Sequence, residues 1–160
     1  MKTKNWLWLL VAVFSLSFYA CSDDSPSTPP EWAIKGGSIN LTPSDHELSR
    51  DEAWKLVKEI MLVNNLKDIA VRSYRNVIPA NDSIQLGFNV KIPTPQYRSW
   101  FFFIEENYDG IEFIGAHQCR YVFVSLDGSA IEVQFRQSGT APKHLGEYDD
   151  FVKSNISSKI

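Results

Sequence analysis

His117 and Cys119 are the two side chains whose types and spacing come closest to a chemical site. Residues two apart on a strand point to the same face, so an imidazole and a thiol placed there could form a nucleophilic pair or bind a soft metal ion. A metal site needs three or four ligands, and the only other cysteine of the chain is Cys21. No neighbouring residue indicates an oxyanion hole or an acid to orient the imidazole. We therefore predict that Cys119 is a buried structural cysteine.

A second group of chemically active side chains is acidic and follows a run of aromatic residues. It consists of Glu105, Glu106, Asp109 and Glu112. Four carboxylates could bind calcium or a basic partner, but their spacing fits no EF-hand loop. The sequence Asn-Tyr-Asp-Gly at 107–110 is typical of a turn, so we expect a solvated loop.

The aromatic run itself covers residues 99–105 and allows two interpretations. Its continuous apolar character predicts a central strand covered on both faces. The alternative is a partner-binding surface formed by Trp100, Phe102 and Tyr108. Solvent exposure distinguishes these interpretations, since an open concave pocket would favour ligand capture, whereas burial beside an open edge strand would favour a protein partner.

The sequence contains no glycine-rich phosphate loop, no Gly-x-Ser-x-Gly elbow and no His-Glu-x-x-His motif. We therefore predict a protein that is not an enzyme and that binds no cofactor or metal ion. A small hydrolase would become the better hypothesis if two titratable side chains converged in a pocket.

The amino-terminal segment has a recognisable order of charge and hydropathy. Lys2 and Lys4 precede an apolar stretch over residues 6–18, and Ala20 is the small residue that a signal peptidase requires. The segment resembles a bacterial lipoprotein signal. The resemblance implies cleavage after residue 20 and a diacylglyceryl group on Cys21, which would anchor the chain in a membrane. An ordinary secretory signal, leaving Cys21 as a plain thiol, is the alternative.

The stretch that follows is polar, acidic and rich in proline over residues 22–30, which predicts an extended spacer. Acidic residues behind the cysteine resemble the surface-export signals of lipoproteins from some Gram-negative gut anaerobes. An outer-membrane lipoprotein is therefore expected, at the cell surface in preference to the periplasmic face. Loss of Lys2 and Lys4 with the signal makes the formal charge of −3 more negative by two, which argues against nucleic acid as a partner.

The expected domain boundaries follow from these segments: 1–20 signal peptide, 21–45 lipidated cysteine and flexible spacer, and 46–160 a single α+β domain. The clearest predicted helix begins at Ser49, which forms a capping box with Glu52. Apolar side chains then recur at helical spacing: Ala53, Leu56, Val57, Ile60 and Met61.

Five strands are expected after the helix, over residues 69–77, 84–92, 99–105, 120–125 and 129–136. Residues 84–92 alternate apolar and polar side chains, and Asp127-Gly128 is a strong hairpin signal. A further edge strand is expected around residues 38–41, and one or two helical turns over 147–153. The fold class is therefore α+β, with one N-terminal helix on an antiparallel sheet of about four to five strands and locally connected neighbours.

Two segments carry a further resemblance. Residues 48–54, Leu-Ser-Arg-Asp-Glu-Ala-Trp, and residues 120–131, from Arg-Tyr-Val-Phe-Val to Gly-Ser-Ala-Ile, are similar to PepSY-like domains. The middle of the chain also resembles prodomain segments that precede some secreted bacterial cysteine peptidases. The resemblance implies a PepSY-like or cystatin-like fold and a non-catalytic binder or inhibitor of an exported peptidase. It assigns no residue an inhibitory contact.

A competing interpretation uses the same order of elements. A helix packed against a cupped sheet would also suit an NTF2-like or cystatin-like lipoprotein that captures a ligand, a toxin or a glycan.

Overall fold

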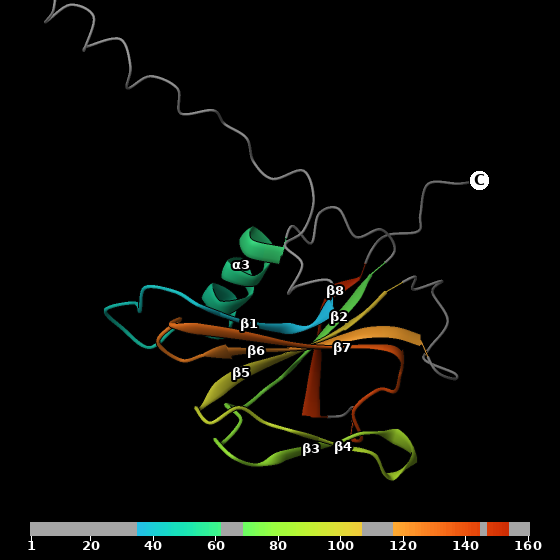
Figure 1. Ribbon diagram of the computed structural model, residues 1–160. Helices are drawn as coiled ribbons and strands as arrows, with labels where there is room; N and C mark the ends of the chain where they lie inside the picture. The colour runs from blue at the N-terminus through green and yellow to red at the C-terminus, as the bar shows by residue number, and fades with distance from the viewer. Residues whose placement is uncertain (1–34, 62–68, 107–116, 145–146, 154–160) are drawn as a thin grey trace, which may run out of the picture.

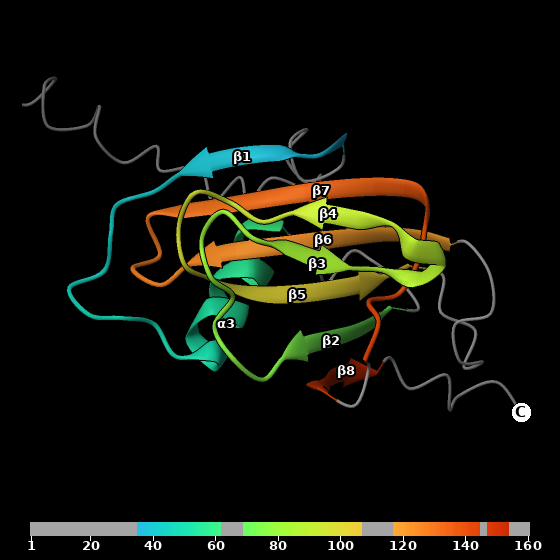
Figure 2. The same ribbon diagram turned by 90° about the horizontal axis from the view of Figure 1, so that it is seen from below.

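The computed structural model describes residues 35–61, 69–106, 117–144 and 147–153. These residues form one helix, a six-stranded antiparallel sheet and a two-stranded hairpin, stacked as three layers with the sheet in the middle (Figures 1 and 2). The elements in chain order are β1 Gly37–Asn40, α3 Arg50–Met61, β2 Ala70–Tyr74, β3 Ser83–Gln85, η2 Gly87–Asn89, β4 Lys91–Pro93, β5 Ser99–Glu105, β6 His117–Ser125, β7 Ala130–Gly139 and β8 Tyr148–Lys153. The α+β class is confirmed, with six strands in the main sheet where four to five were expected.

Helix α3 starts with the predicted capping box. The Ser49 backbone N–H donates to Glu52 Oε2 at 2.8 Å, and the Glu52 N–H donates to Ser49 Oγ at 3.3 Å. The Ser49 hydroxyl also donates to Glu52 Oε2, and these bonds to the ionised carboxylate lower the pKa of Glu52 to about 2. Because two N-terminal N–H groups are satisfied in this way, the helix begins where the sequence indicates.

The main sheet has the order β1-β7-β6-β5-β2-β8. Strands β5, β6 and β7 are consecutive neighbours, as local connections predict. The turn between β6 and β7 contains Gly128 at φ 70°, where a side chain would be strained. Asp127 Oδ1 accepts from Ser125 Oγ at 2.7 Å and from the Ser129 N–H at 3.0 Å. The predicted Asp-Gly hairpin is therefore confirmed.

Two core clusters lie on opposite faces of the sheet. The helix-side core lies under α3 and consists of Ala53, Trp54, Val57, Ile69, Val71, Phe102, Ile104, Val122, Val124, Ile131 and Val133. The hairpin-side core lies under β3 and β4 and consists of Ile78, Ile84, Leu86, Ile92, Phe101, Phe103, Cys119, Tyr121, Phe123 and Tyr148. Alternate residues of β5 enter alternate clusters, which explains why its sequence is continuously apolar.

Two expectations about strands are wrong. Residues 84–92 do not form one strand, because the chain turns back at η2 and makes the β3–β4 hairpin. Residues 148–153 are not helical, because β8 pairs antiparallel with β2. In both cases hydrogen bonds to residues far away in the sequence decide the outcome over the local pattern.

The sheet also includes part of the stretch that was expected to be spacer. β1 pairs with β7 in the register Gly37↔Val133 to Asn40↔Ala130, so the folded part begins before residue 46. The edge strand expected around 38–41 is thereby confirmed. No helix among the described residues is long and apolar enough to cross a membrane.

Candidate functional site

Of the three aromatic residues considered as a partner surface, the structure describes Phe102 and Trp100. Phe102 is fully buried, with its ring centroid 5.5 Å from that of Trp54. Trp100 is half-buried, and its indole N–H donates to the Leu48 carbonyl at 2.7 Å. Tyr108 lies outside the described residues, as do Asp109 and Glu112 of the acidic group. Phe102 cannot touch a partner while the fold is intact, and the central-strand interpretation of β5 is confirmed.

Cys119 lies in the hairpin-side core and is fully buried. Gly139 on β7 packs directly against it, because a Cβ added at Gly139 would come within 2.0 Å of Cys119 Sγ. Burial raises the pKa of the Cys119 thiol, so the reactive thiolate is disfavoured. These observations confirm the prediction of a buried cysteine.

Charged side chains next to Cys119 form a paired group at one end of β5 and β6. His117 Nδ1 lies 3.5 Å from Glu105 Oε1, and Arg120 forms an ion pair with Glu106. The Arg120 guanidinium also lies 5.2 Å from the centroid of the Phe135 ring, and burial lowers its pKa to about 10. Each of these charges has an oppositely charged neighbour, which is the condition under which charged groups are tolerated in a protein interior, so the group needs no ligand to explain it.

Three shallow grooves on the described surface are large enough to consider as ligand sites. Their volumes are about 350 Å³ beside α3, about 320 Å³ beside the β6–β7 turn and about 210 Å³ between β8 and the β3–β4 hairpin. The last contains the imidazole of His144 and the carboxylates of Asp82 and Glu147, which are all exposed. Among the described residues no three His, Cys, Asp or Glu side chains could hold a metal ion.

The edge strand β8 carries charged side chains that are paired with arginines, and we call this strand the guarded edge. Asp149 accepts from Arg50 Nη1 and from Arg75 Nε, each at 2.8 Å, and Asp150 lies 3.4 Å from Arg72 Nε. The pairing of β8 with β2 also shifts register between Val71 and Arg72. Charged side chains and a bulge are the devices by which proteins prevent an edge strand from pairing with another chain.

The opposite edge, at β1, has none of these devices. Its residues are Gly, Ser, Ile and Asn, and only Ile39 is partly buried, against the helix-side core. The Leu41 N–H donates to the Ser129 carbonyl at 2.7 Å, which continues the register of β1 and β7 as a hydrogen-bonded pair. Hydrogen-bonded and non-hydrogen-bonded residue pairs alternate along an antiparallel ladder. The N–H and C=O groups of Ser38 and Asn40 therefore point away from β7, toward the open side.

The open edge extends past the start of β1. β7 continues to Gly139, whereas β1 covers it only over residues 130–133 within the described part of the chain. Gly36 has φ 88° and lies close against β7 just before β1 begins. A Cβ at this position would lie 3.1 Å from the Val133 carbonyl oxygen and 3.2 Å from the Phe135 nitrogen, so glycine suits the position. We call β1 and the outer side of residues 134–139 the open edge.

One surface feature was missed by the sequence analysis. Phe88 is 82% exposed at the turn of the β3–β4 hairpin, although the alternating pattern assigned its side chain to the buried face of a strand. The signal that could have found it is its flanks, since Gly87 and Asn89 are both common in tight turns.

The chain was also compared with protein-family models, with curated proteins and with solved structures, and none of the three comparisons finds a match.

Proposed function

We propose that this chain is an exported, lipid-anchored protein that binds another exported protein, with a secreted peptidase as the first candidate, and that it catalyses no reaction. The observation that carries the proposal is the open edge, in which Ser38 and Asn40 belong to the uncharged strand β1 and their backbone groups face outward. An extended segment of a partner can add to such an edge as a further strand.

The chemistry of the open edge suits recognition through the main chain. Ser38 and Asn40 are short, polar and exposed, so they leave the outward backbone groups accessible. Residues Arg136, Gln137 and Ser138 on the neighbouring part of β7 are exposed as well. A partner strand would obtain affinity from backbone hydrogen bonds and specificity from these side chains.

The filled hairpin face favours a protein partner over capture of a small ligand. In a cupped-sheet binder that face would be hollow, but here Ile84, Leu86 and Ile92 of the hairpin fill it. Their partners from the sheet include Phe101 and Phe123, whose ring centroids are 5.0 Å apart. The ligand-capture and glycan-capture alternatives therefore have no apolar cup to use among the described residues.

The anchor is supported by the amino-terminal pattern that ends at Cys21, whose thiol would carry the diacylglyceryl group. The outer membrane, with the domain at the cell surface or on the periplasmic face, is the proposed location. Metabolic labelling with palmitate tests this directly: the wild-type chain should incorporate label, and the Cys21→Ser variant should not.

Photo-crosslinking tests the proposed surface. A photoreactive amino acid is placed at Ser38, and in a matched control at Asp150 on the guarded edge, in cells that export the protein. We expect crosslinks from position 38 to an exported peptidase and few from position 150. Binding of that purified peptidase is then measured for wild type and for Ser38→Pro, which removes one outward N–H and leaves the β1–β7 ladder intact.

A loss of affinity of about tenfold in Ser38→Pro, with Ser38→Val close to wild type, would support the proposal, because valine retains the donor. Tight binding of glycans with no affinity for any co-exported peptidase would reject it in favour of the ligand-capture alternative.

A further inference from the structure

Two large hydrophobic side chains stand out on the described surface, and both belong to one turn. Phe88 is 82% exposed and Val90 is 48% exposed. Isolated exposed hydrophobic residues are common, but two of them at the end of a projecting hairpin form a small apolar patch. We call residues 87–90 the hairpin tip.

The backbone of the hairpin tip is strained so as to display Phe88. Phe88 has φ 53° and ψ 29°, and Asn89 has φ 60°. The Val90 N–H donates to the Gly87 carbonyl at 3.2 Å, which closes a tight turn with both central residues in the left-handed region. Glycine or asparagine is usual at the position of Phe88, and an aromatic residue there costs on the order of 1 kcal/mol or more.

Residues 141–143, which follow β7, hold the hairpin tip through three hydrogen bonds. The Gly87 N–H donates to the Ala141 carbonyl at 2.9 Å, and the Lys143 N–H donates to the Gln85 carbonyl at 2.8 Å. Lys143 Nζ also donates to Asn89 Oδ1 at 2.8 Å. These three bonds tie the turn to residues 141–143, so the Phe88 ring is presented on a braced turn.

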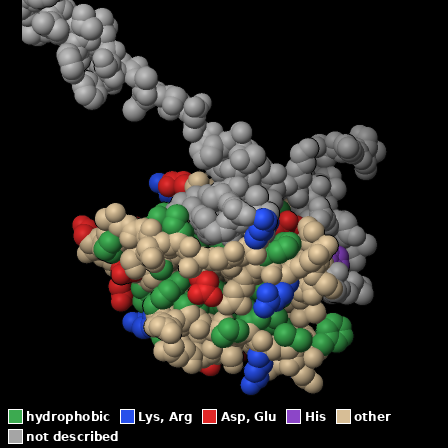
Figure 3. Space-filling view, viewed as in Figure 1, with side chains coloured by type: hydrophobic (Ala, Val, Ile, Leu, Met, Phe, Trp, Pro, Cys, Tyr) green, Lys and Arg blue, Asp and Glu red, His purple; other side chains and the backbone are tan. Residues whose placement is uncertain are grey.

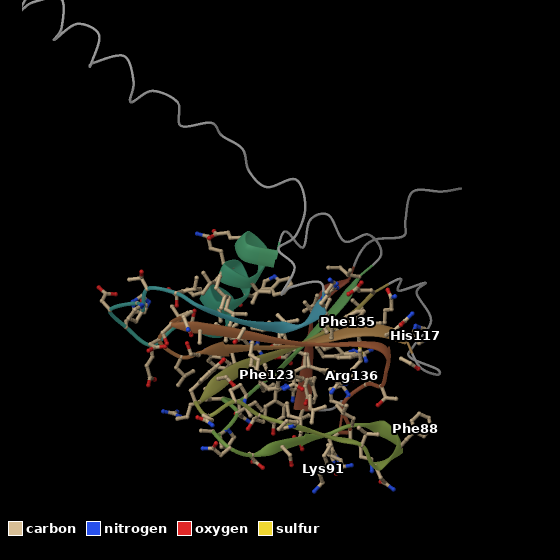
Figure 4. The ribbon with its side chains drawn as sticks, in the orientation of Figure 1. Phe88, Lys91, His117, Phe123, Phe135 and Arg136 are labelled. Carbon is tan, nitrogen blue, oxygen red and sulfur yellow. The ribbon has the colours of Figure 1, made fainter. Side chains whose placement is uncertain are left out.

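Cationic side chains surround the tip. Lys91 follows it in the chain and is exposed, Lys143 contacts it, and Arg136 is exposed on the neighbouring end of β7. Figure 4 shows Phe88, Lys91 and Arg136 on the same part of the molecule, and Figure 3 shows a hydrophobic side chain standing out there beside Lys and Arg side chains. The protein is acidic as a whole, but this end of it is locally basic.

The tether from Cys21 joins the domain at the same end of the sheet. Gly36 lies against Phe135, and Gly87 lies against Thr140, only five residues further along the chain from Phe135. The 15 residues from Cys21 to Lys35 can span at most about 50 Å, so the anchor and the tip can reach one membrane surface together.

We propose that the hairpin tip is a membrane-contact site that inserts Phe88 and Val90 into the interfacial region of the bilayer holding the anchor. The inference rests on the lipid anchor of the proposed function. An aromatic ring at an apolar tip with lysine and arginine around it matches the interface of a bilayer, where aromatic rings lie at headgroup level and cations contact phosphates. A protein interface would instead need about 800 Å² of complementary surface, which a projecting turn does not offer.

Contact of the hairpin tip with the bilayer would fix the orientation of the domain. The hairpin lies on the face of the sheet opposite α3, so a bilayer below the tip leaves α3 in water and places the open edge at the side (Figures 1 and 2). A weak contact suffices, because the anchor already holds the tip at a high effective concentration near the bilayer. The tip would therefore orient the domain and keep the open edge accessible to a partner.

The test uses the chain from Cys21 to Ile160, coupled through the Cys21 thiol to a maleimide lipid in vesicles. Cys119 is buried and does not compete for coupling. The vesicles contain phosphatidylcholine and phosphatidylglycerol in a three-to-one ratio with brominated acyl chains, which quench nearby tryptophan. Phe88→Trp is compared with Lys58→Trp, a control at an exposed position of α3 on the opposite face.

We expect the fluorescence of Phe88→Trp, taken as the excess over the signal of Trp32, Trp54 and Trp100 in the unsubstituted chain, to fall about twofold more than that of the control treated in the same way, with a blue shift of its emission. Adding Lys91→Ala should reduce that difference, and removing phosphatidylglycerol should do the same. Equal quenching of the two variants would overturn the proposal. Because the anchor is attached chemically, that outcome is distinct from a failure of Cys21 to be lipidated in cells, which palmitate labelling reports.

Discussion

β8 and β1 are the two edge strands of one sheet, and they differ in what holds and guards them. β8 packs the ring of Tyr148 into the hairpin-side core and carries two aspartates paired with arginines of α3, β2 and the residue after β2. β1 packs only Ile39, and that side chain is partly buried. Its other residues carry no charge.

Within the described residues, the sheet protects the β8 edge and leaves the β1 edge available. An unguarded edge exposes a protein to unwanted pairing, and sequences ordinarily place a charge, a proline or a bulge there. β8 has the charge and the bulge, so the same sheet contains the means of protection and uses it on one side. An edge that lacks them beside one that has them is the pattern expected when pairing at the first edge serves a function.

The largest effect on stability is expected from removing the side chain of Tyr148, which holds the guarded edge β8 to the hairpin-side core. The Tyr148 ring lies 5.1 Å from that of Tyr74 and 6.1 Å from that of Phe101, between centroids, and is almost fully buried. Tyr148→Ala should lower the free energy of unfolding by about 3 kcal/mol, as measured by denaturant titration. Tyr148→Phe should cost less than about 1 kcal/mol. A small effect of the alanine variant would show that β8 does not depend on this ring.

A smaller effect is expected from the same change on the open edge. Ile39→Ala should cost about 1 to 2 kcal/mol, below the range for fully buried isoleucine, because Ile39 is only partly buried. Hydrogen exchange measures the same difference by a second route, since amides of β1 should exchange sooner than those of β8. Equal protection of the two strands would contradict the idea that β1 is the less firmly held edge.

The amino-acid pattern predicted α3, β5 and the β6–β7 hairpin because each has a local cause. Ser49 and Glu52, three positions apart, satisfy the first turn of the helix, and Asp127 with Gly128 closes the β6–β7 turn. β5 is continuously apolar because both of its faces are covered. Local signals suffice wherever the partners lie close together in the chain.

The two strand errors have non-local causes. The turn at Phe88 is held by bonds from the Gly87 N–H to the Ala141 carbonyl and from Lys143 Nζ to Asn89 Oδ1, each between residues more than fifty positions apart. β8 forms because β2, over seventy residues earlier, offers it a ladder. For the same reason the open edge could be anticipated as a strand at 38–41 but not as a surface, since its outward groups are defined only by the register with β7.

The charge guard of β8 should depend on pH. Bonds from Arg75 and then from Arg50 lower the pKa of Asp149 below its ordinary value of 3.8. A carboxylate with a lowered folded pKa stabilises the fold above its unfolded pKa and loses that contribution as the pH falls through the folded pKa. Wild type should therefore be more stable than Asp149→Asn near neutral pH, and the difference should shrink below pH 3.8. Thermal unfolding of both proteins across that range measures it, and a constant difference would contradict the pairing.

The smallest effect on stability is expected from adding a charged side chain to β1. Asn40→Lys places a charge on the open edge without touching the β1–β7 ladder, because the backbone groups of Asn40 point outward and its side chain is exposed. The free energy of unfolding should change by less than about 0.5 kcal/mol. Asn40→Thr, which keeps the edge uncharged, is the matched control. Affinity for the crosslinked partner should fall in the lysine variant and not in the threonine variant, because a charge on an edge strand opposes strand addition. Equal affinity in both would mean that partners do not pair with β1, and the contrast between the two edges would then be one of stability alone.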